Sequence, residues 1–464
     1  MLKSFSATLV LVSGILLISV SPAASPSGEP GQTVTKFDRT GHSQGPASVR
    51  DIDNILPHRD RARVENAWLE WRLDNIVPAL MRRENIDMWI VINREYNEDP
   101  VYLTMLPQPA MASAGMSALI FHDRGETEGV ARFSSGPRAA GAHYPNIWTD
   151  RRLGQFERLA EFIREAAPQR IGVGISRVWA YGDGLSVSIR DRLVEALGTE
   201  LSGRLVSAEH LAVGWLETRS PMEISAYRYV AGIAHDLIRE FYSNRVIVPE
   251  VTTTDDVVWW IRDRIAGLGL ETWFQPTVSL QRRQDAARDN VIRRGDLLHC
   301  DVGIVYLGLC TDMQWQAYVL RSEETDVPDG LKDALRQANR VADILMAEFV
   351  EGRTGREIVE AATARAEAEG LRPLIYTHPI GFHGHGAGCF IDARPEDRID
   401  ENNKYRKYYP LYPDTAYAIE FSSTTSVPEW GGQDVRIGFE ETAIFTGGVC
   451  RFVDGRQTEF LIIR

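Results

Sequence analysis

The sequence predicts an α+β protein in which a smaller α/β unit precedes a larger unit of helices and antiparallel hairpins. Three observations predict this arrangement. Helical and strand-like patterns alternate up to about Trp215, a strong helix start follows at Ser220, and amphipathic helices then alternate with paired strand-like segments. We therefore expect one domain over residues 51–216 and a second over residues 217–464.

Length and composition indicate an ordinary globular protein. The chain has 464 residues, of which 44% are hydrophobic and 25% charged, and its formal net charge is −13. This composition excludes wholesale disorder and a multi-span membrane protein. Nucleic-acid binding needs clustered lysine and arginine, and no basic run occurs. The sequence thus favours a peptide or small-molecule partner over a nucleic acid, and it leaves a homodimer open.

The only long apolar stretch lies at the start of the chain. Lys3 precedes a near-continuous apolar run from Phe5 to Val20, and small residues follow. This order is typical of a cleavable secretory signal peptide over residues 1–24, and the Ser-, Gly- and Pro-rich residues 25–50 then form a flexible leader. We expect a secreted or periplasmic protein without a membrane span after cleavage. An uncleaved anchor is the alternative, which the shortness of the run disfavours.

The α/β unit begins with a helix and continues with short strands. Apolar residues recur at helical spacing from Val64 to Glu84 and again from Phe156 to Ala166. Short apolar runs bounded by turn residues predict strands over 88–92, 118–121, 130–133 and 171–175. No group of catalytic side chains accompanies these elements.

The second unit starts at a well-marked helix. Ser220 suits the N-cap, Pro221 the first helical position, and Glu223 completes a capping box. Further helical patterns cover 253–265, 331–349 and 354–368, and strand-like segments cover 296–306, 309–320, 415–427 and 435–445.

The first predicted hairpin carries two aspartates. With a turn near Tyr306 and Leu307, Asp301 and Asp312 lie opposite each other on one sheet face. Two like charges in apolar surroundings repel each other, and a divalent cation between them resolves the conflict. Solvated strand acids are the alternative.

The second predicted hairpin repeats this pattern with glutamates. A turn within residues 428–432 places Glu420 opposite Glu440, and an unpaired carboxylate in the apolar segment around Glu420 would be costly. A slip of one residue would exchange Glu440 for Glu441.

A histidine-rich segment lies between the two hairpins. It contains His378, His383 and His385 among glycines, which let the backbone approach an ion closely. We interpret His385 as a metal ligand, whereas His378 and His383 are expected to be hydrogen-bonded structural residues.

In this order the acidic residues and the histidine resemble the metal ligands of the M24 metallopeptidases, the group of methionine aminopeptidase, aminopeptidase P and prolidase; the matching positions are Asp301, Asp312, His385, Glu420 and Glu440. The resemblance runs from about Arg219 to the C-terminus and implies the pita-bread fold. The preceding α/β unit is similar to the N-terminal domain of aminopeptidase P, prolidase and creatinase.

The resemblance implies hydrolysis of the bond between an N-terminal residue and proline, by an Xaa-Pro aminopeptidase or dipeptidase. Four carboxylates and an imidazole suit two divalent ions, either Mn²⁺, Co²⁺, Zn²⁺ or Fe²⁺. By analogy, Glu420 would act as general base as well as ligand. His383 or His299 would stabilise the oxyanion, and Arg436 stands near the place of the family's arginine.

Three positions depart from the family pattern. The family usually has a second histidine seven residues after the ligand, where this chain has Asp392, and another about seventeen residues before the first aspartate, within Gln281–Asp285 here. Arg436 stands four residues before Glu440 rather than two, which predicts a β-bulge. His299 and His383 are the candidate substitutes for the missing histidines.

These departures keep two other functions open. One is a non-peptide hydrolase or lyase on the same scaffold, as in creatinase, and the other is a metal-free binding pseudoenzyme, against which the full ligand set counts. Among the four cysteines, Cys300 and Cys310 point to opposite sheet faces by strand parity, so no disulfide is expected between them.

Overall fold

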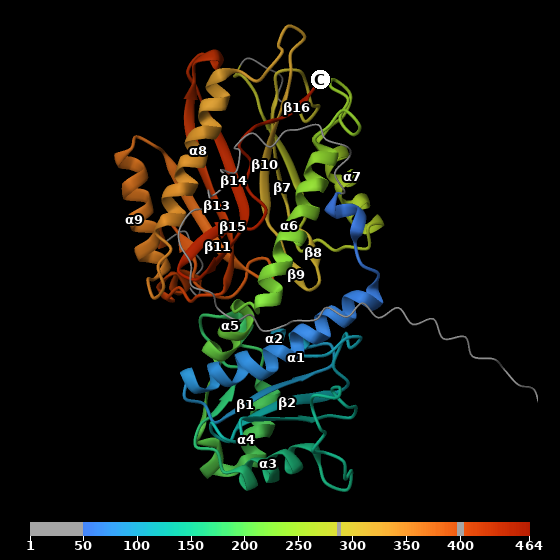
Figure 1. Ribbon diagram of the computed structural model, residues 1–464. Coiled ribbons are helices and arrows are strands. Elements are labelled where there is room, and N and C mark those ends of the chain that lie inside the picture. Colours follow the sequence, from blue (N-terminus) through green and yellow to red (C-terminus); the bar gives the residue numbers. More distant parts are fainter. Residues whose placement is uncertain (1–49, 285–288, 397–402) are drawn as a thin grey trace, which may run out of the picture. The chain divides into compact units, whose positions relative to one another are not determined.

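Strand pairing divides the structure into two main sheets, one on each side of the expected domain boundary. The computed structural model describes residues 50–284, 289–396 and 403–464 (Figure 1). The expected signal peptide, all of the expected leader except Arg50, and Asp285 lie outside the described residues. The boundary near residue 216 stays a prediction, because the described residues on both sides of it belong to one compact unit.

The first sheet has five strands in the order β3-β2-β1-β4-β5. Strands β1 to β3 pair antiparallel, whereas β4 and β5 continue the sheet in parallel. All four predicted strands and both predicted helices of this unit occur. The elements are η1 (Asp51–Asn54), α1 (His58–Arg83), β1 (Met88–Arg94), α2 (Pro100–Thr104), β2 (Met116–Asp123), β3 (Val130–Ser135), α3 (Gln155–Ala166), β4 (Ile171–Val173), η2 (Ala180–Gly182), α4 (Val187–Ser202), β5 (Leu205–Ser207) and α5 (Glu209–Glu217).

The second sheet runs in the order β12-β11-β13-β14-β10-β7-β6, with β15 paired to β14 and β16 to β10. Strands β8 and β9 form a small separate hairpin between β7 and β10. The elements are α6 (Pro221–Phe241), α7 (Thr254–Gly267), β6 (Thr277–Gln281), β7 (Leu297–Val302), β8 (Val305–Tyr306), β9 (Leu309–Cys310), β10 (Met313–Val319), α8 (Asp329–Ala347), α9 (Gly355–Ala368), β11 (Pro373–Ile380), β12 (Ile391–Asp392), η4 (Asn403–Tyr408), β13 (Thr415–Val427), η5 (Pro428–Trp430), β14 (Gln433–Thr446), β15 (Val449–Phe452) and β16 (Leu461–Ile463).

Helix α6 begins where the sequence predicts. The Glu223 N–H donates to Ser220 Oγ at 3.1 Å, and the Ser220 N–H donates to the Glu223 carboxylate at 2.6 Å. Pro221 occupies the first helical position, so the predicted capping box is confirmed.

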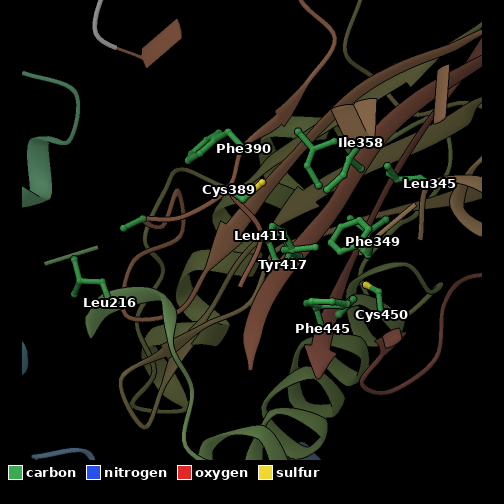
Figure 2. Packing of buried hydrophobic residues seen from close by; sticks show 14 of the residues in the cluster. Leu216, Leu345, Phe349, Ile358, Cys389, Phe390, Leu411, Tyr417, Phe445 and Cys450 are labelled. Carbon is green, nitrogen blue, oxygen red and sulfur yellow. The ribbon is translucent and has the colours of Figure 1, made fainter. Parts of the chain in front are cut away.

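Helix α8 covers one face of the second sheet (Figure 1). Alternate residues of β13 turn toward this helix and are buried with it in one apolar cluster that includes Tyr417, Ile419, Phe421, Leu335 and Leu345. Figure 2 shows Phe349 beside Tyr417 and Phe445, with ring centroids 5.1 and 6.1 Å apart. Because side chains alternate along a strand, the even-numbered residues of β13 point to the opposite face.

The β13–β14 hairpin has the predicted register. Glu420 pairs directly with Glu440, and the turn contains Gly431 and Gly432, both with positive φ. The predicted bulge is wrong, because pairing is unbroken from Thr415–Phe445 to Val427–Gln433. An offset of four residues keeps Arg436 on the same face as Glu440 without any bulge.

The first hairpin differs from its prediction by two residues. Asp301 pairs with Gln314 rather than with Asp312, and the connection folds back at Leu307 and Gly308. Both turn residues have positive φ, 54° and 67°, as a two-residue hairpin turn requires, and glycine accepts this readily. A shift of two residues preserves strand parity, so both aspartates still belong to one face.

All four cysteines have free, buried thiols. Among the helices of the described ranges, none combines the length and the apolar content needed to cross a bilayer.

Candidate active site

A row of polar side chains crosses the face of the second sheet that α8 does not cover. Successive strand pairings align Thr277 of β6, Asp301 of β7, Gln314 of β10, Glu440 of β14 and Glu420 of β13. Directly paired residues of antiparallel strands point to the same side. The sheet itself therefore gathers three of the predicted carboxylates.

His378 of β11 lies at the centre of the carboxylate cluster. Its Nε2 is 3.6 Å from Asp312 Oδ2, 3.6 Å from Glu420 Oε2 and 3.5 Å from Glu440 Oε1. Asp312, His378 and Glu440 are all buried and could together hold a metal ion. His378 was expected to be structural, so its position here corrects that expectation.

Four atoms in this cluster are buried and make no hydrogen bond within the described residues. They are Asp301 Oδ1, Asp312 Oδ1, His378 Nε2 and Glu440 Oε1. Buried polar groups almost always have a hydrogen-bond partner, so four buried polar atoms without one indicate that a partner is missing. Divalent ions are coordinated by carboxylate oxygens and imidazole nitrogens, so these residues fit such ions.

Burial and mutual repulsion dominate the electrostatics of the acids. Burial, together with Glu420, raises the pKa of Asp301 to about 7. Burial and the neighbouring carboxylates raise the pKa values of Asp312 and Glu440 well above their usual range. Although burial alone would lower the pKa of His378, Glu440 and Glu420 raise it. A cation would relieve this repulsion.

The Gln314 side chain donates hydrogen bonds to both glutamates of the cluster. The sequence did not predict this role. Gln314 Nε2 donates to Glu420 Oε1 at 3.0 Å and to Glu440 Oε2 at 2.9 Å, and Gln314 Oε1 lies 2.8 Å from His299 Nε2. His299, a candidate for oxyanion stabilisation, thus contacts the glutamine. Strand parity with Asp312, two residues earlier, was the available signal for Gln314.

His385, the predicted ligand, packs beside the cluster. Its ring centroid is 4.6 Å from that of His378 in an edge-to-face arrangement, and its backbone oxygen accepts a hydrogen bond from Tyr181 at 2.5 Å. Burial, then His378, Arg406 and Arg394, lower the pKa of His385 to about 4. The geometry therefore favours His378 over His385 as the nitrogen ligand, and the ligand role of His385 stays a prediction.

His383 lies two residues before His385 in the same loop. It stacks on Tyr181 at 4.4 Å and borders a cavity of about 330 Å³ whose walls include Trp68, Leu103 and Phe382. Burial lowers the pKa of His383 to about 4, so it is neutral near pH 7. Its role in oxyanion stabilisation stays a prediction.

Arg436 and Asp392 flank the cluster. Arg436 is exposed on β14 opposite Thr424, and its backbone exchanges two hydrogen bonds with the Gln281 side chain. Asp392 is buried and accepts hydrogen bonds from the Arg394 guanidinium at 2.7 to 3.1 Å. The Asp392 carboxylate is therefore paired with the Arg394 guanidinium.

Trp273 connects the histidine loop to the aspartate strand. Its Nε1 donates to the Thr311 carbonyl at 2.9 Å, one residue before Asp312, and its ring lies 5.3 Å from that of His385. The same ring occupies the space next to Gly384 that a Cβ would need. Gly384 is thus required for close packing of the loop.

Comparison with protein families identifies the second unit. Residues 225–447 match the model of metallopeptidase family M24. This segment is an M24 metallopeptidase domain. The family pattern has a second histidine seven residues after the ligand histidine, and His385 stands seven residues after His378. With His378 as ligand, Asp392 no longer replaces an expected histidine.

Solved structures of M24 enzymes share the fold of this chain. An X-Pro aminopeptidase from Thermotoga maritima MSB8 is 14% identical, with a TM-score of 0.57 over 83% of this chain and 99% of that one. An Xaa-Pro dipeptidase from Bacillus anthracis is 17% identical, with a TM-score of 0.56 over 86% and 99%. The dipeptidase PepE from Mycobacterium ulcerans is 17% identical, with a TM-score of 0.55 over 86% and 98%. None of the curated proteins matches the chain by sequence.

Proposed function

We propose that this metallopeptidase is an exported enzyme that uses two divalent ions to hydrolyse the bond between an N-terminal residue and proline. The observation that carries the proposal is the meeting of His378 with buried carboxylates whose inner atoms lack partners. The printed names of the similar structures, an X-Pro aminopeptidase and an Xaa-Pro dipeptidase, support proline-containing peptides as substrates.

The residues that would hold the ions are Asp301, Asp312, His378, Glu420 and Glu440. Bound ions would lower the pKa of a water and polarise the scissile carbonyl. Glu420 Oε1 accepts from Gln314, whereas Oε2 faces His378. Oε2 is therefore the atom that would take a proton from the attacking water and pass it to the leaving nitrogen. Neutral His385 would donate a hydrogen bond to the substrate carbonyl oxygen.

Two arginines near His385 favour substrates with a free carboxylate. Arg394 is bound to Asp392, whereas Arg406 lies 3.8 Å over the Phe390 ring and its buried Nε has no hydrogen-bond partner among the described residues. Among the described residues, Asp392 is the one carboxylate paired with these two guanidinium groups, which leaves a net positive charge. A peptide C-terminus would complete their hydrogen bonding, because guanidinium binds carboxylate in a fork geometry. Dipeptides are therefore the proposed preferred substrates.

Turnover of matched peptides tests the substrate proposal. Purified protein is treated with a chelator, reloaded with Mn²⁺ or Co²⁺, and assayed on Ala-Pro, Ala-Pro-amide, Ala-Pro-Ala and the control Ala-Ala. We expect cleavage of Ala-Pro, a higher KM for the amide, and no cleavage of Ala-Ala. Loss of activity in Glu420→Gln would tie the turnover to this site. A metal-loaded protein inert on every Xaa-Pro bond would remove the peptidase proposal in favour of a non-peptide substrate.

Export and metal identity need separate measurements. The N-terminal apolar run supports export, and N-terminal sequencing of the mature protein should find a start near residue 25. Metal analysis of the protein as isolated should find divalent ions, with manganese as the proposed native metal.

A further inference from the structure

The neutral groups around Gln314 form an ordered chain of hydrogen bonds behind the carboxylates. The Ser279 hydroxyl lies 3.3 Å from His299 Nδ1, His299 Nε2 lies 2.8 Å from Gln314 Oε1, and Gln314 Nε2 reaches Glu420 and Glu440. Each of these hydrogen bonds joins two different strands of the second sheet. The chain therefore couples β6 at the sheet edge to the two glutamates in the interior.

The chemistry of these groups allows one direction for the chain. Ion binding requires ionised Glu420 and Glu440, and an ionised carboxylate only accepts hydrogen bonds, so the NH₂ group of Gln314 must face these two residues. Its oxygen then faces His299, whose Nε2 must carry the hydrogen and whose Nδ1 accepts from the Ser279 hydroxyl. Turning the amide over would place its oxygen against two carboxylates. His299 thus fixes the orientation of the Gln314 amide.

A glycine makes room for this arrangement. A Cβ on Gly438 would lie 2.6 Å from Gln314 Oε1 and 2.6 Å from His299 Nε2. Gly438 stands two residues before Glu440 on the same face of β14, so any side chain there would displace the pair. A glycine at position 438 is therefore required for the contact between His299 and Gln314.

The amide divides the oxygens of the two glutamates into two sets. Glu420 Oε1 and Glu440 Oε2 accept from Gln314, whereas Glu420 Oε2, Glu440 Oε1 and Asp312 Oδ2 surround His378 Nε2. Three oxygens and one nitrogen are thus available on the His378 side. On the other side, the Asp301 carboxylate and Asp312 Oδ1 make no hydrogen bond within the described residues, whereas the second oxygen of Glu440 is bound to Gln314.

We propose that Gln314, oriented by His299, is a positioning residue that makes the two ion positions of this centre unequal. It leaves a full donor set beside His378 and withholds an oxygen of Glu440 from the position beside Asp301. This inference rests on the metal-dependent function proposed above. It predicts one tightly held ion and a second that binds more weakly and exchanges more readily.

Calorimetric titration of chelator-treated protein with Mn²⁺ tests this directly. The wild-type chain should bind the first ion about tenfold or more tightly than the second, the scale expected for a hydrogen bond to a charged group. Gln314→Met keeps the length of the side chain but removes both donors, so the second affinity should rise and the difference should shrink. Gln316→Met is the matched control, because the Gln316 amide on the same strand donates to the Gly438 carbonyl and to no carboxylate.

Thermal unfolding with and without Mn²⁺ separates positioning from simple structural support. Loss of a structural hydrogen bond alone would lower both midpoints equally and leave the affinity ratio unchanged, which would overturn the proposal. We expect instead a lower midpoint for metal-free Gln314→Met and a larger rise on adding Mn²⁺. His299→Phe, which frees the amide to turn, should shift the ratio in the same direction and carries the test if Gln314→Met does not fold.

The remaining outcomes are also decisive. Two equal affinities in the wild-type chain would refute the inference while leaving the peptidase proposal intact. A wild-type chain that binds no divalent ion would refute both. Unequal affinities without turnover of any Xaa-Pro peptide would support the inference and count against the substrate proposal alone.

Discussion

At the scale of single residues, the choice between two histidines determines how the centre is built. His378 belongs to a strand and approaches three carboxylates at 3.5 to 3.6 Å, whereas His385 belongs to a loop and contacts the ring of His378. A ligand on a strand is held by the sheet, so little reorganisation accompanies ion binding. His385 is then placed to assist the reaction and to orient its neighbour.

Replacing each histidine in turn distinguishes the two roles. His378→Ala removes a ligand, so Mn²⁺ affinity should fall by at least about 100-fold, beyond the effect of losing an outer contact. His385→Ala should change the affinity by no more than about tenfold while lowering kcat. Calorimetry gives the affinities and an Ala-Pro assay gives kcat. The reverse ranking would return the ligand role to His385.

The buried acids make stability of the metal-free protein depend on pH. Burial and repulsion raise the pKa of Asp301 to about 7 and raise those of Asp312 and Glu440 well above their ordinary values. A carboxyl whose folded pKa is raised contributes stability below its unfolded pKa and loses it as pH rises through the folded pKa. For Asp301 this window runs from about pH 4 to about pH 7.

Thermal unfolding at several pH values checks this expectation. With a chelator present, the midpoint should fall as pH rises from 5 to 8. The increase caused by Mn²⁺ should grow over the same interval, because the ion takes the place of the bound protons. Asp312→Asn should flatten the pH dependence of the chelated protein. An Mn²⁺ effect that is equal at pH 5 and pH 8 would contradict the prediction.

At the scale of elements, Trp273 holds the histidine loop against the segment that joins β9 to β10. Gly384→Ala would drive a methyl group into the Trp273 ring, so either the loop or the indole must move. We expect a loss of about 1 to 3 kcal/mol in the free energy of unfolding and a lower kcat, because His385 is adjacent. Denaturant unfolding and the Ala-Pro assay measure both.

Gly267→Ala is the control for this substitution. Gly267 ends α7, a Cβ there meets no atom within 4 Å, and alanine favours the helix. Unchanged or slightly higher stability is expected. Equal effects of the two substitutions would show that Gly384 has no special packing role.

Local patterns predicted the elements well, because their signals are local. The capping box at Ser220 and the apolar periodicity of α8 depend on neighbours in sequence, and the glycines at 431 and 432 fixed the second turn. The first hairpin was misplaced by two residues, because its turn requires positive φ at Leu307, which only the adjoining Gly308 hints at.

Prediction of the candidate site required knowledge of which strands pair with one another and in which register. The order of the four carboxylates was available from the sequence. The position of His378 among them was not, since His378 and His385 both lie in one short segment. The spacing of seven residues between them was the available signal. The contact between Gln314 and His299 depends on the pairing of β7 with β10, so only the register reveals it.

At the scale of the whole molecule, a buried ion network ties the first long helix to the start of the second unit. Arg72 of α1 donates to Glu223 Oε2 at 2.8 Å, and Arg219 donates to Glu223 Oε1 at 3.2 Å. All three side chains are almost completely buried. Although burial opposes it, the two guanidinium groups lower the pKa of Glu223.

Glu223→Gln should therefore destabilise the whole chain. It leaves two buried guanidinium groups without a counter-charge, which costs about 3 to 5 kcal/mol in the free energy of unfolding. Because the folded pKa of Glu223 is lowered, its contribution exists above the unfolded pKa and disappears as pH falls through the folded value. The variant should thus lose most stability relative to wild type near neutral pH and little in acid.

Denaturant unfolding at pH 7 and at low pH measures this difference. Asp434→Asn, which breaks the exposed pair of Asp434 with Arg372, is the matched control and should leave the unfolding midpoint nearly unchanged, because solvent screens surface charges. Adding Arg72→Met to Glu223→Gln should restore part of the lost stability, since one of the uncompensated charges is then removed. If the double variant is as unstable as the sum of its parts, the ion network does not act as a unit, and packing of α1 alone must join the two regions.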